Sequence, residues 1–307
     1  MNFQQLRIIR ETLRRDFNLT DVAAALSTSQ PGVSKHIKDL EDELGIEIFE
    51  RRGKRFLGLT AAGKEIATVV ERILLDASNI RQIADQFASR DEGTLIIATT
   101  HTQARYVLPD IVKRFKDTYP RVHLTLHQGS PREISNLVAA GEADIAIATE
   151  ALDVSEIVTF PCYTWHHAVI VPEGHPLCQE VSITLEQLAA YPIITYQEGF
   201  TGRGLIDKTF AKAGLAPDIV LSAIDADVIK TYVEVGLGIG IIASMAYSPQ
   251  RDRNLRMLDT HQLFPINTTR LGIRRGHYLR DYAFHLVEML APRLKGAAIR
   301  AALNRDG

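Results

Sequence analysis

Apolar residues recur at helical spacing in two short segments near the N-terminus. Val22 and Leu26 mark the apolar face of the first segment, and Val33, Ile37 and Leu40 mark that of the second. Serine and threonine interrupt the pattern between them. The spacing therefore predicts two short helices that are joined by a tight turn and pack through their apolar faces.

Signals for helix starts support this division. Thr20 is placed to cap the first helix, and Ser29 is placed to cap the second. Pro31 falls in the first turn of the second helix, where its missing N–H costs little. The two helices form a predicted helix-turn-helix, in which the second helix can enter the major groove of DNA.

Side chains suited to DNA follow on this second helix and on the segment after it. Gln can pair with adenine, Lys can reach guanine, and Ser can meet base edges or phosphates. Gly53 marks the tip of a predicted hairpin, and the stretch from Arg51 to Lys64 holds five Lys or Arg and no acidic residue, which indicates a phosphate-binding wing. The alternative is a three-helix bundle with a solvated basic loop. The predicted DNA contacts are Thr28, Ser29, Gln30, Pro31, Ser34, Lys35 and Lys38 on the helix and Arg51, Arg52, Lys54 and Arg55 on the wing.

Apolar residues also form a heptad seam after the wing, in a helix predicted from Thr60 to about Ser89. Spacings of four and three alternate along it, and two alanines permit close approach of a partner helix. The seam consists of Ile66, Val70, Ile73, Ala77, Ile80, Ala84 and Phe87. This helix could lie on its own chain, but we expect it to pair with a second subunit, which would place two recognition helices on an inverted repeat.

From Gly93 onward, predicted strands alternate with predicted helices. This alternation is typical of mostly parallel sheets with helices on both faces. The strands are 94–98, 122–126, 144–148, 168–171, 193–196, 238–242 and 270–273, and the helices are 102–118, 131–139, 202–213, 227–235 and 279–294.

The changes in this pattern near 161–164 and 265–269 predict two α/β subdomains with two chain crossovers. Residues 93–162 and 267–307 would form subdomain I, and residues 163–266 would form subdomain II. In such folds, ligands bind beyond the carboxyl ends of the strands.

Polar clusters follow three of the predicted strands, at 99–103, 149–150 and 199–203. Backbone N–H groups at helix starts, joined by threonine hydroxyls and a glutamine amide, suit a small anion or a carboxylate. The clusters therefore predict a ligand site in the cleft between the subdomains. The alternative is that these threonines only cap their helices.

Composition and charge exclude several classes of protein. The chain has 307 residues, enough for two or three domains, and its net charge of −2 means that DNA affinity must come from where the basic residues lie. The first residues lack the plan of a signal peptide, and no apolar stretch is long enough for a bilayer. Cys162 and Cys178 give neither a disulfide framework nor metal-ligand spacing. We expect a cytoplasmic protein with no membrane partner, metal or cofactor.

The helix-turn-helix and wing resemble the N-terminal domain of LysR-type transcriptional regulators. The resemblance is carried by residues 28–35, 40–41, 44–45 and 48–51, although Ile48 stands where the family more often has Leu. It implies promoter DNA and RNA polymerase as partners, and a homodimer that assembles further into a homotetramer.

The length of the chain matches this family as well. The implied domains are a winged helix-turn-helix at 1–59, a linker and dimerisation helix at 60–92, and an effector domain at 93–307 that resembles periplasmic binding proteins.

Segments of the effector domain are similar to the cysteine-regulon (CysB and Cbl) branch of that family, namely 99–106, 127–131, 148–151, 199–203 and 225–232. This similarity implies a regulator of sulfate assimilation and cysteine biosynthesis that senses acetylserine, sulfate or thiosulfate. A paralogous regulator of sulfonate genes, which senses a different sulfur anion, is the alternative. The implied effector contacts are Thr100, Thr102, Gln103, Thr149 and Thr201.

One departure concerns Glu198, which would repel an anion if it pointed inward; we expect it to point outward.

An enzyme and a solute-binding protein are the other classes considered. His101, Glu150 and Asp225 could serve as acid–base groups, but the sequence has no nucleophile elbow, metal-spaced cluster or phosphate loop. A solute-binding protein would share the cleft but would lack the helix-turn-helix. We therefore predict no catalytic residue and interpret His166 and His167 as solvated.

Overall fold

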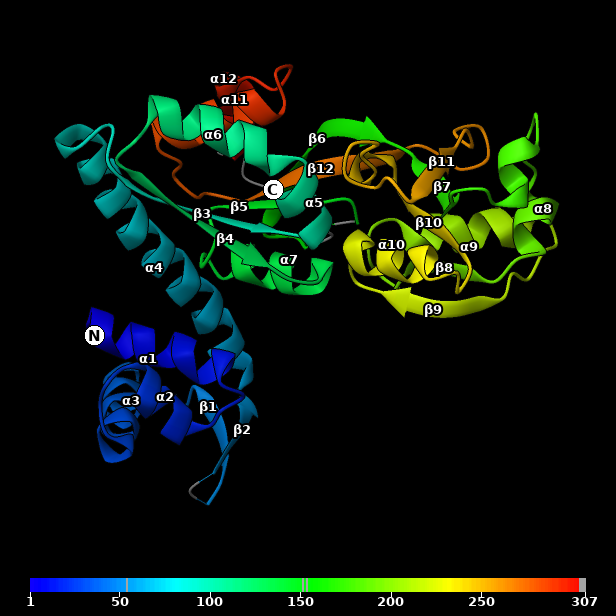
Figure 1. Cartoon of the computed structure of the whole chain (residues 1–307). Helices are drawn as coiled ribbons and strands as arrows, with labels where there is room; N and C mark the ends of the chain where they lie inside the picture. Colours follow the sequence, from blue (N-terminus) through cyan, green and yellow to red (C-terminus); the bar gives the residue numbers. More distant parts are fainter. Residues whose placement is uncertain (54, 151, 153, 304–307) are drawn as a thin grey trace. The chain divides into compact units, whose positions relative to one another are not determined.

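The computed structural model describes residues 1–53, 55–150, 152 and 154–303 (Figure 1). Its contacts divide the chain into two units, Met1–Ala84 and Asp85–Gly307. Lys54, one of the predicted wing contacts, lies outside the described residues. Within them, no helix combines the length and the apolar character that crossing a bilayer requires.

The first unit surrounds one apolar core with three helices and a hairpin. Val33, Ile37 and Leu40 are buried there, as the helical spacing predicted. The elements are α1 (Phe3–Arg14), α2 (Leu19–Ala25), α3 (Gln30–Leu44), β1 (Phe49–Arg52) and β2 (Arg55–Leu59), with β1 and β2 antiparallel.

Short polar side chains fix the starts of the two central helices. The hydroxyl of Ser29 caps α3 by accepting the N–H of Gly32 at 3.2 Å, as predicted. The cap of α2 is Asn18 and not Thr20, because Asn18 immediately precedes the first helical residue and its side chain accepts the Thr20 N–H at 3.1 Å.

The long helix α4 (Ala61–Ala88) carries the heptad seam, and the two halves of that seam differ in burial. In the first half, Val70 is buried in the core of the N-terminal unit, and Ile66 and Ile73 pack against it. In the second half, Ile80 is 68% exposed and Phe87 is 86% exposed. The first half is therefore used within the chain, and only the second half presents an uncovered apolar stripe.

The second unit contains two five-stranded sheets, which correspond to the two subdomains. The first has the strand order β4-β3-β5-β12-β6, and the second has the order β11-β7-β10-β8-β9. The strands of subdomain I are β3 (Gly93–Thr99), β4 (Val122–Gln128), β5 (Ile145–Ala148), β6 (Ile157–Trp165) and β12 (Asn267–Arg274); those of subdomain II are β7 (His167–Pro172), β8 (Ile193–Tyr196), β9 (Ile219–Ala223), β10 (Ile239–Ala243) and β11 (Leu255–Leu258).

Each sheet is covered by helices on both faces (Figure 1). In subdomain I, α6 (Leu108–Thr118), α11 (Asp281–Leu290) and α12 (Gly296–Leu303) pack on one face and α7 (Pro131–Ala139) on the other. In subdomain II, α8 (Leu185–Ala189) and α9 (Arg203–Lys212) lie opposite α10 (Ala226–Glu234). Each subdomain thus has its own core, and Tyr106 of subdomain I also packs against the core of subdomain II.

The sheets are mixed rather than mostly parallel. β12 pairs antiparallel with both β5 and β6, and β10 pairs parallel with β8 but antiparallel with β7. The two crossing segments cause this mixture. β6 leaves subdomain I at Trp165, three residues beyond the expected end at 162, and β12 brings the chain back from Asn267 beside it.

One further prediction about local structure is wrong, and three strands were missed. The helix predicted at 102–118 is two helices, α5 (His101–Tyr106) and α6, because Pro109 cannot donate the N–H that would continue α5. The strands β6, β9 and β11 were not predicted. β6 contains Pro161, which an edge strand tolerates beside a bulge.

Candidate functional site

The predicted DNA contacts on α3 and in the turn before it face solvent. Thr28, Gln30, Lys35 and Lys38 are exposed, and Ser34 is partly exposed. The amide of Gln30 donates to the Ser34 hydroxyl at 3.1 Å, which holds the two side chains together at the start of the helix. A base edge could therefore take the place of the contact between Gln30 and Ser34, and neither side chain would have to be ordered from a free state.

The arginines of the wing lie in two different environments. Arg52 and Arg55 are exposed and face each other across the hairpin tip. The guanidinium of Arg51 instead hydrogen-bonds the buried carboxylate of Glu41 and lies 4.7 Å over the ring of Phe56. Arg51 thus has a structural partner inside the N-terminal unit, whereas Arg52 and Arg55 are directed to solvent.

In the second unit, four of the five predicted effector contacts meet where the two sheets adjoin. We call this cluster the threonine junction: Thr102, Gln103, Thr149, Thr201 and Thr269. Hydroxyl contacts of 3.3 Å link Thr102 to Thr201, from opposite subdomains, and Thr149 to Thr269, and the Gln103 amide donates to Thr269 at 3.4 Å. The junction thus contains two bonded groups: Thr102 with Thr201 across the subdomains, and Thr269 with both Gln103 and Thr149.

Thr100, the remaining predicted contact, lies next to this network. It is 3% exposed and occupies the N-cap of α5, but its side chain makes no capping hydrogen bond. Capping was the alternative explanation for this threonine, and the structure does not support that explanation.

Aromatic residues complete the junction, and the sequence interpretation missed them. The indole N–H of Trp165 donates to Thr269 at 3.1 Å and to Thr149 at 3.3 Å, and the hydroxyl of Tyr163 donates to the amide oxygen of Gln103. Burial raises the pKa of Tyr163, so it stays a donor. The available signal was the concentration of polar and aromatic residues in the two crossing segments.

His167 is buried in the junction and not solvated as expected. Its Nε2 lies 3.0 Å from the backbone oxygen of Thr201, and its Nδ1 lies 3.2 Å from the side-chain nitrogen of Asn267. Burial lowers the pKa of His167 to about 4, so the ring is neutral near pH 7. A neutral ring with Nε2 protonated satisfies both contacts, since it donates to Thr201 and accepts from Asn267.

A carboxylate also reaches across the junction, and it belongs to Glu150. Its Oε1 accepts the N–H of Gly202, at the N-cap of α9, at 2.6 Å. Burial raises the pKa of Glu150, and the hydrogen bond from Gly202 partly offsets this effect. Glu198, which raised the question of anion repulsion from the sequence, is exposed and points outward as expected.

The backbone at Thr201 is strained. Its φ is +44°, in the left-handed region, where a β-branched residue is a genuine outlier. Such a conformation costs on the order of 1–3 kcal/mol and persists only where the surroundings fix it. The contacts of Thr201 with Thr102 and His167 supply this constraint and place its hydroxyl toward subdomain I.

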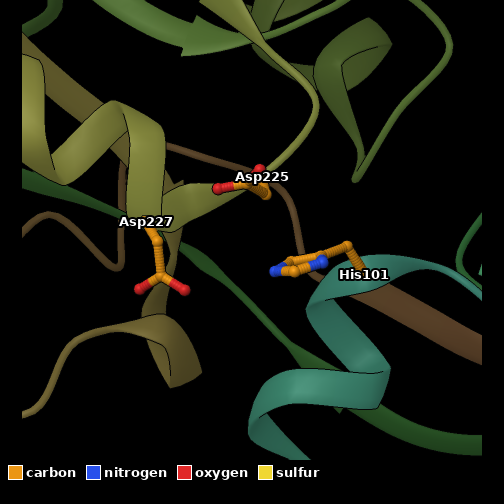
Figure 2. A group of neighbouring side chains, drawn as sticks. All are labelled: His101, Asp225 and Asp227. Atoms are coloured by element: carbon orange, nitrogen blue, oxygen red, sulfur yellow. The ribbon is translucent and has the colours of Figure 1, made fainter.

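A second polar group spans the subdomains at the starts of α5 and α10. Figure 2 shows His101 facing Asp225 and Asp227, and their ligand-type atoms all lie within 4.8 Å of one another. Asp227 already has cationic partners, because Arg105 and Lys230 each approach its carboxylate to 3.1 Å. This arrangement disfavours a metal ion, which would have to compete with both charges.

Comparison with known proteins covers nearly the whole chain. Residues 3–64 match the family described as "Bacterial regulatory helix-turn-helix protein, lysR family", and residues 88–295 match "LysR substrate binding domain". These matches coincide with the winged helix-turn-helix and with the two-subdomain unit.

Full-length relatives and one solved domain agree with these matches. The chain is 60% identical to the HTH-type transcriptional regulator SsuR of Burkholderia cenocepacia, over 99% of each protein. It is 52% identical to the regulator CysB of the same organism, over 100% of this chain and 98% of the relative. The structure of the cofactor-binding domain of the Cbl transcriptional regulator shares 49% identity and a TM-score of 0.67, and the match covers 70% of this chain and 95% of that one. These relatives are regulators and not enzymes.

Proposed function

Because this chain belongs to the LysR family of helix-turn-helix transcriptional regulators, we propose that it controls genes of sulfur supply in response to a small anionic effector. Its relatives SsuR, CysB and Cbl support the sulfur role. The regulated genes would be those of sulfate assimilation and cysteine biosynthesis, with genes for sulfonate use as the alternative. The protein would act in the cytoplasm, on promoter DNA and together with RNA polymerase.

The threonine junction is the observation that carries the effector proposal. It joins donors from both subdomains, namely hydroxyls, the Gln103 amide and the Trp165 indole, at one buried point beside the start of α9. Neutral donors of this kind can surround an anion without a counter-charge. The effector would be acetylserine or a sulfur oxyanion such as sulfate or thiosulfate, in contact with Thr100, Thr102, Gln103, Thr149 and Thr201.

The mechanism follows from the contacts that cross the junction. An anion bound there would replace the 3.3 Å contact between Thr102 and Thr201 with bonds from each hydroxyl to the ligand. The two subdomains would then be held through the ligand, at a different separation. Such a ligand shifts the protein between states only as far as it binds them with different affinity.

DNA output would come from the N-terminal units of a symmetric assembly. We propose that the exposed second half of the α4 seam, around Ile80 and Phe87, pairs with a second subunit to form the homodimer. A homotetramer built from two such dimers would carry four recognition helices. The proposed base and phosphate contacts are the exposed residues of α3 together with Arg52 and Arg55.

A titration of the full-length protein tests this proposal directly. Trp165 is the only tryptophan in the sequence, and its indole bonds the junction, so its fluorescence reports binding there. N-acetylserine, O-acetylserine, sulfate and thiosulfate would be added in turn, with calorimetry in parallel. We expect at least one to bind, to perturb Trp165, and to change the DNA footprint. The absence of binding by all four would contradict the proposed effector.

A further inference from the structure

Two buried acceptor oxygens lie beside Gly202 without a hydrogen-bond partner. They are Oε2 of Glu150 and Oδ1 of Asn267, and they are the only buried side-chain oxygens in this state among the described residues. The other carboxylate oxygen of Glu150 accepts the Gly202 N–H, and a Cβ built on Gly202 would lie 2.4 Å from Asn267 Oδ1. Both acceptors therefore border the same glycine, although Glu150 follows β5 and Asn267 begins β12.

An unpartnered buried acceptor is unfavourable, typically by about 1–3 kcal/mol and by more for a charged group. Neighbouring side chains do not satisfy these two. The ring of His167 is neutral and its nitrogens face Thr201 and Asn267. The junction hydroxyls and the Trp165 indole bond one another. Close to the donor groups of the junction, the chain thus holds two buried acceptors that have no hydrogen-bond partner.

We propose that Glu150 and Asn267 form a subsite for a hydrogen-bond donor carried by the effector. This inference rests on the proposed function and specifies its ligand: an anion that also bears an N–H or O–H group. The anionic group binds the threonine hydroxyls, and the N–H or O–H group donates to Glu150 Oε2 and Asn267 Oδ1. Glu150 is then the residue that determines specificity.

The consequence is discrimination between two classes of effector. An acylated amino acid carries a carboxylate together with an amide N–H, and so it matches both sides of the site. Sulfate is fully ionised at neutral pH and brings only acceptors, which would face a carboxylate. A buried polar group rejects a ligand that leaves it without a hydrogen-bond partner.

Glu150→Gln tests the subsite with almost no change in shape. The glutamine oxygen can still accept the Gly202 N–H, while the second carboxylate oxygen becomes an NH2 donor. We expect this variant to weaken N-acetylserine binding about tenfold or more, since it loses a hydrogen bond to a charged acceptor, and to leave sulfate binding equal or tighter. The readouts are calorimetry and Trp165 fluorescence of the full-length protein.

Two further variants separate specificity from folding. Glu198→Gln makes the same chemical change at a nearby exposed glutamate and should alter neither ligand. Glu150→Asp keeps the charge at shorter reach and should retain the preference for N-acetylserine even if both affinities fall.

Equal changes for both ligands in Glu150→Gln, or no change for N-acetylserine, would overturn the subsite alone. If the wild-type protein bound none of the four compounds titrated above, the proposed effector would be contradicted, and the subsite with it.

Discussion

The guanidinium of Arg51 on β1 is bonded to the carboxylate of Glu41 on α3. That carboxylate is 7% exposed and also accepts the backbone N–H groups of Ile48 and Phe49, at 2.8 and 3.2 Å. One acidic side chain therefore fixes the start of the wing against the recognition helix. The recognition helix and the wing are thus linked through Glu41 within the N-terminal unit.

Replacing Glu41 with Ala should destabilise the N-terminal unit by about 3 kcal/mol or more, because it leaves two buried N–H groups and one arginine without their acceptor. Hydrogen exchange of residues 3–59 in the full-length protein would measure this loss. Glu50→Ala, at an exposed position of the same strand, is the control and should stay within about 0.5 kcal/mol of wild type. Similar exchange in both variants would contradict the structural role of Glu41.

Arg52 should behave differently from Arg51. Its side chain is exposed on the wing, so Arg52→Ala should leave stability unchanged and weaken binding to all DNA sequences alike. The plot of log affinity against log salt should lose about one unit of slope, as expected for one phosphate contact. Gln30→Ala is the matched comparison and should instead relax the preference at a single base pair. A sequence-specific loss in Arg52→Ala would exclude the phosphate role.

The sequence predicted the elements of the N-terminal unit better than the site of the second unit. Val33, Ile37 and Leu40 lie on one helix at spacings of four and three residues, and this local spacing is enough to bury them on one face. The junction combines residues that are far apart in the chain: Thr102 meets Thr201, and Thr149 meets Thr269. The threonines could be predicted because each follows a strand or resembles a known segment. Thr269 lies inside β12 and Trp165 is the last residue of β6, and their pairing depends on two crossings that periodicity does not specify.

His167 and Glu150 show a second limit of sequence reasoning. Histidine is intermediate in its tendency to be buried, and glutamate is mostly exposed. Here the fold buries His167 and a carboxylate oxygen of Glu150. Only the resulting contacts with Thr201 and Gly202 indicate what the two side chains do. Glu198, in contrast, follows the general expectation and is exposed.

Thr100→Ala should separate sensing from DNA binding. Thr100 is buried beside the junction and makes no capping bond, so its loss should cost α5 little. We expect effector affinity to fall about tenfold, as for one hydrogen bond to an anion, while effector-free binding to promoter DNA is unchanged. Calorimetry and a gel-shift assay would measure the two quantities. Unchanged effector affinity would remove Thr100 from the site.

Gly202 and Gly214 allow the junction to be tested by a matched pair of substitutions. Both have φ of +72°, so an alanine at either position carries the same backbone strain of about 1–2 kcal/mol. A Cβ at Gly214 meets nothing within 4 Å, whereas at Gly202 it would lie 2.4 Å from Asn267 and 2.9 Å from His167. Gly202→Ala should therefore be the more destabilising by about 1–3 kcal/mol and should also reduce effector binding. Denaturant unfolding followed by Trp165 fluorescence would show the difference, and equal losses would mean that the junction is loosely packed.

The buried imidazole of His167 makes stability depend on pH in a defined window. Its pKa falls from the ordinary 6.5 to about 4 in the folded chain, because burial disfavours the charged ring. Between these values the unfolded chain binds more protons, so this group makes the free energy of unfolding decrease as pH falls from 6.5 towards 4, by at most about 1.4 kcal/mol per pH unit.

His167→Gln removes this titration but keeps a side chain that can both donate and accept. The variant should be less stable than wild type at pH 7.5, and the difference should shrink as the pH is lowered to 5. Groups that titrate equally in both proteins, including Glu150 if its surroundings are unchanged, cancel in this comparison. The measurement is denaturant unfolding followed by the fluorescence of Trp165. The ring centroid of Trp165 lies 5.0 Å from that of His167. A difference that stays constant from pH 7.5 to 5 would show that His167 is not buried as a neutral ring.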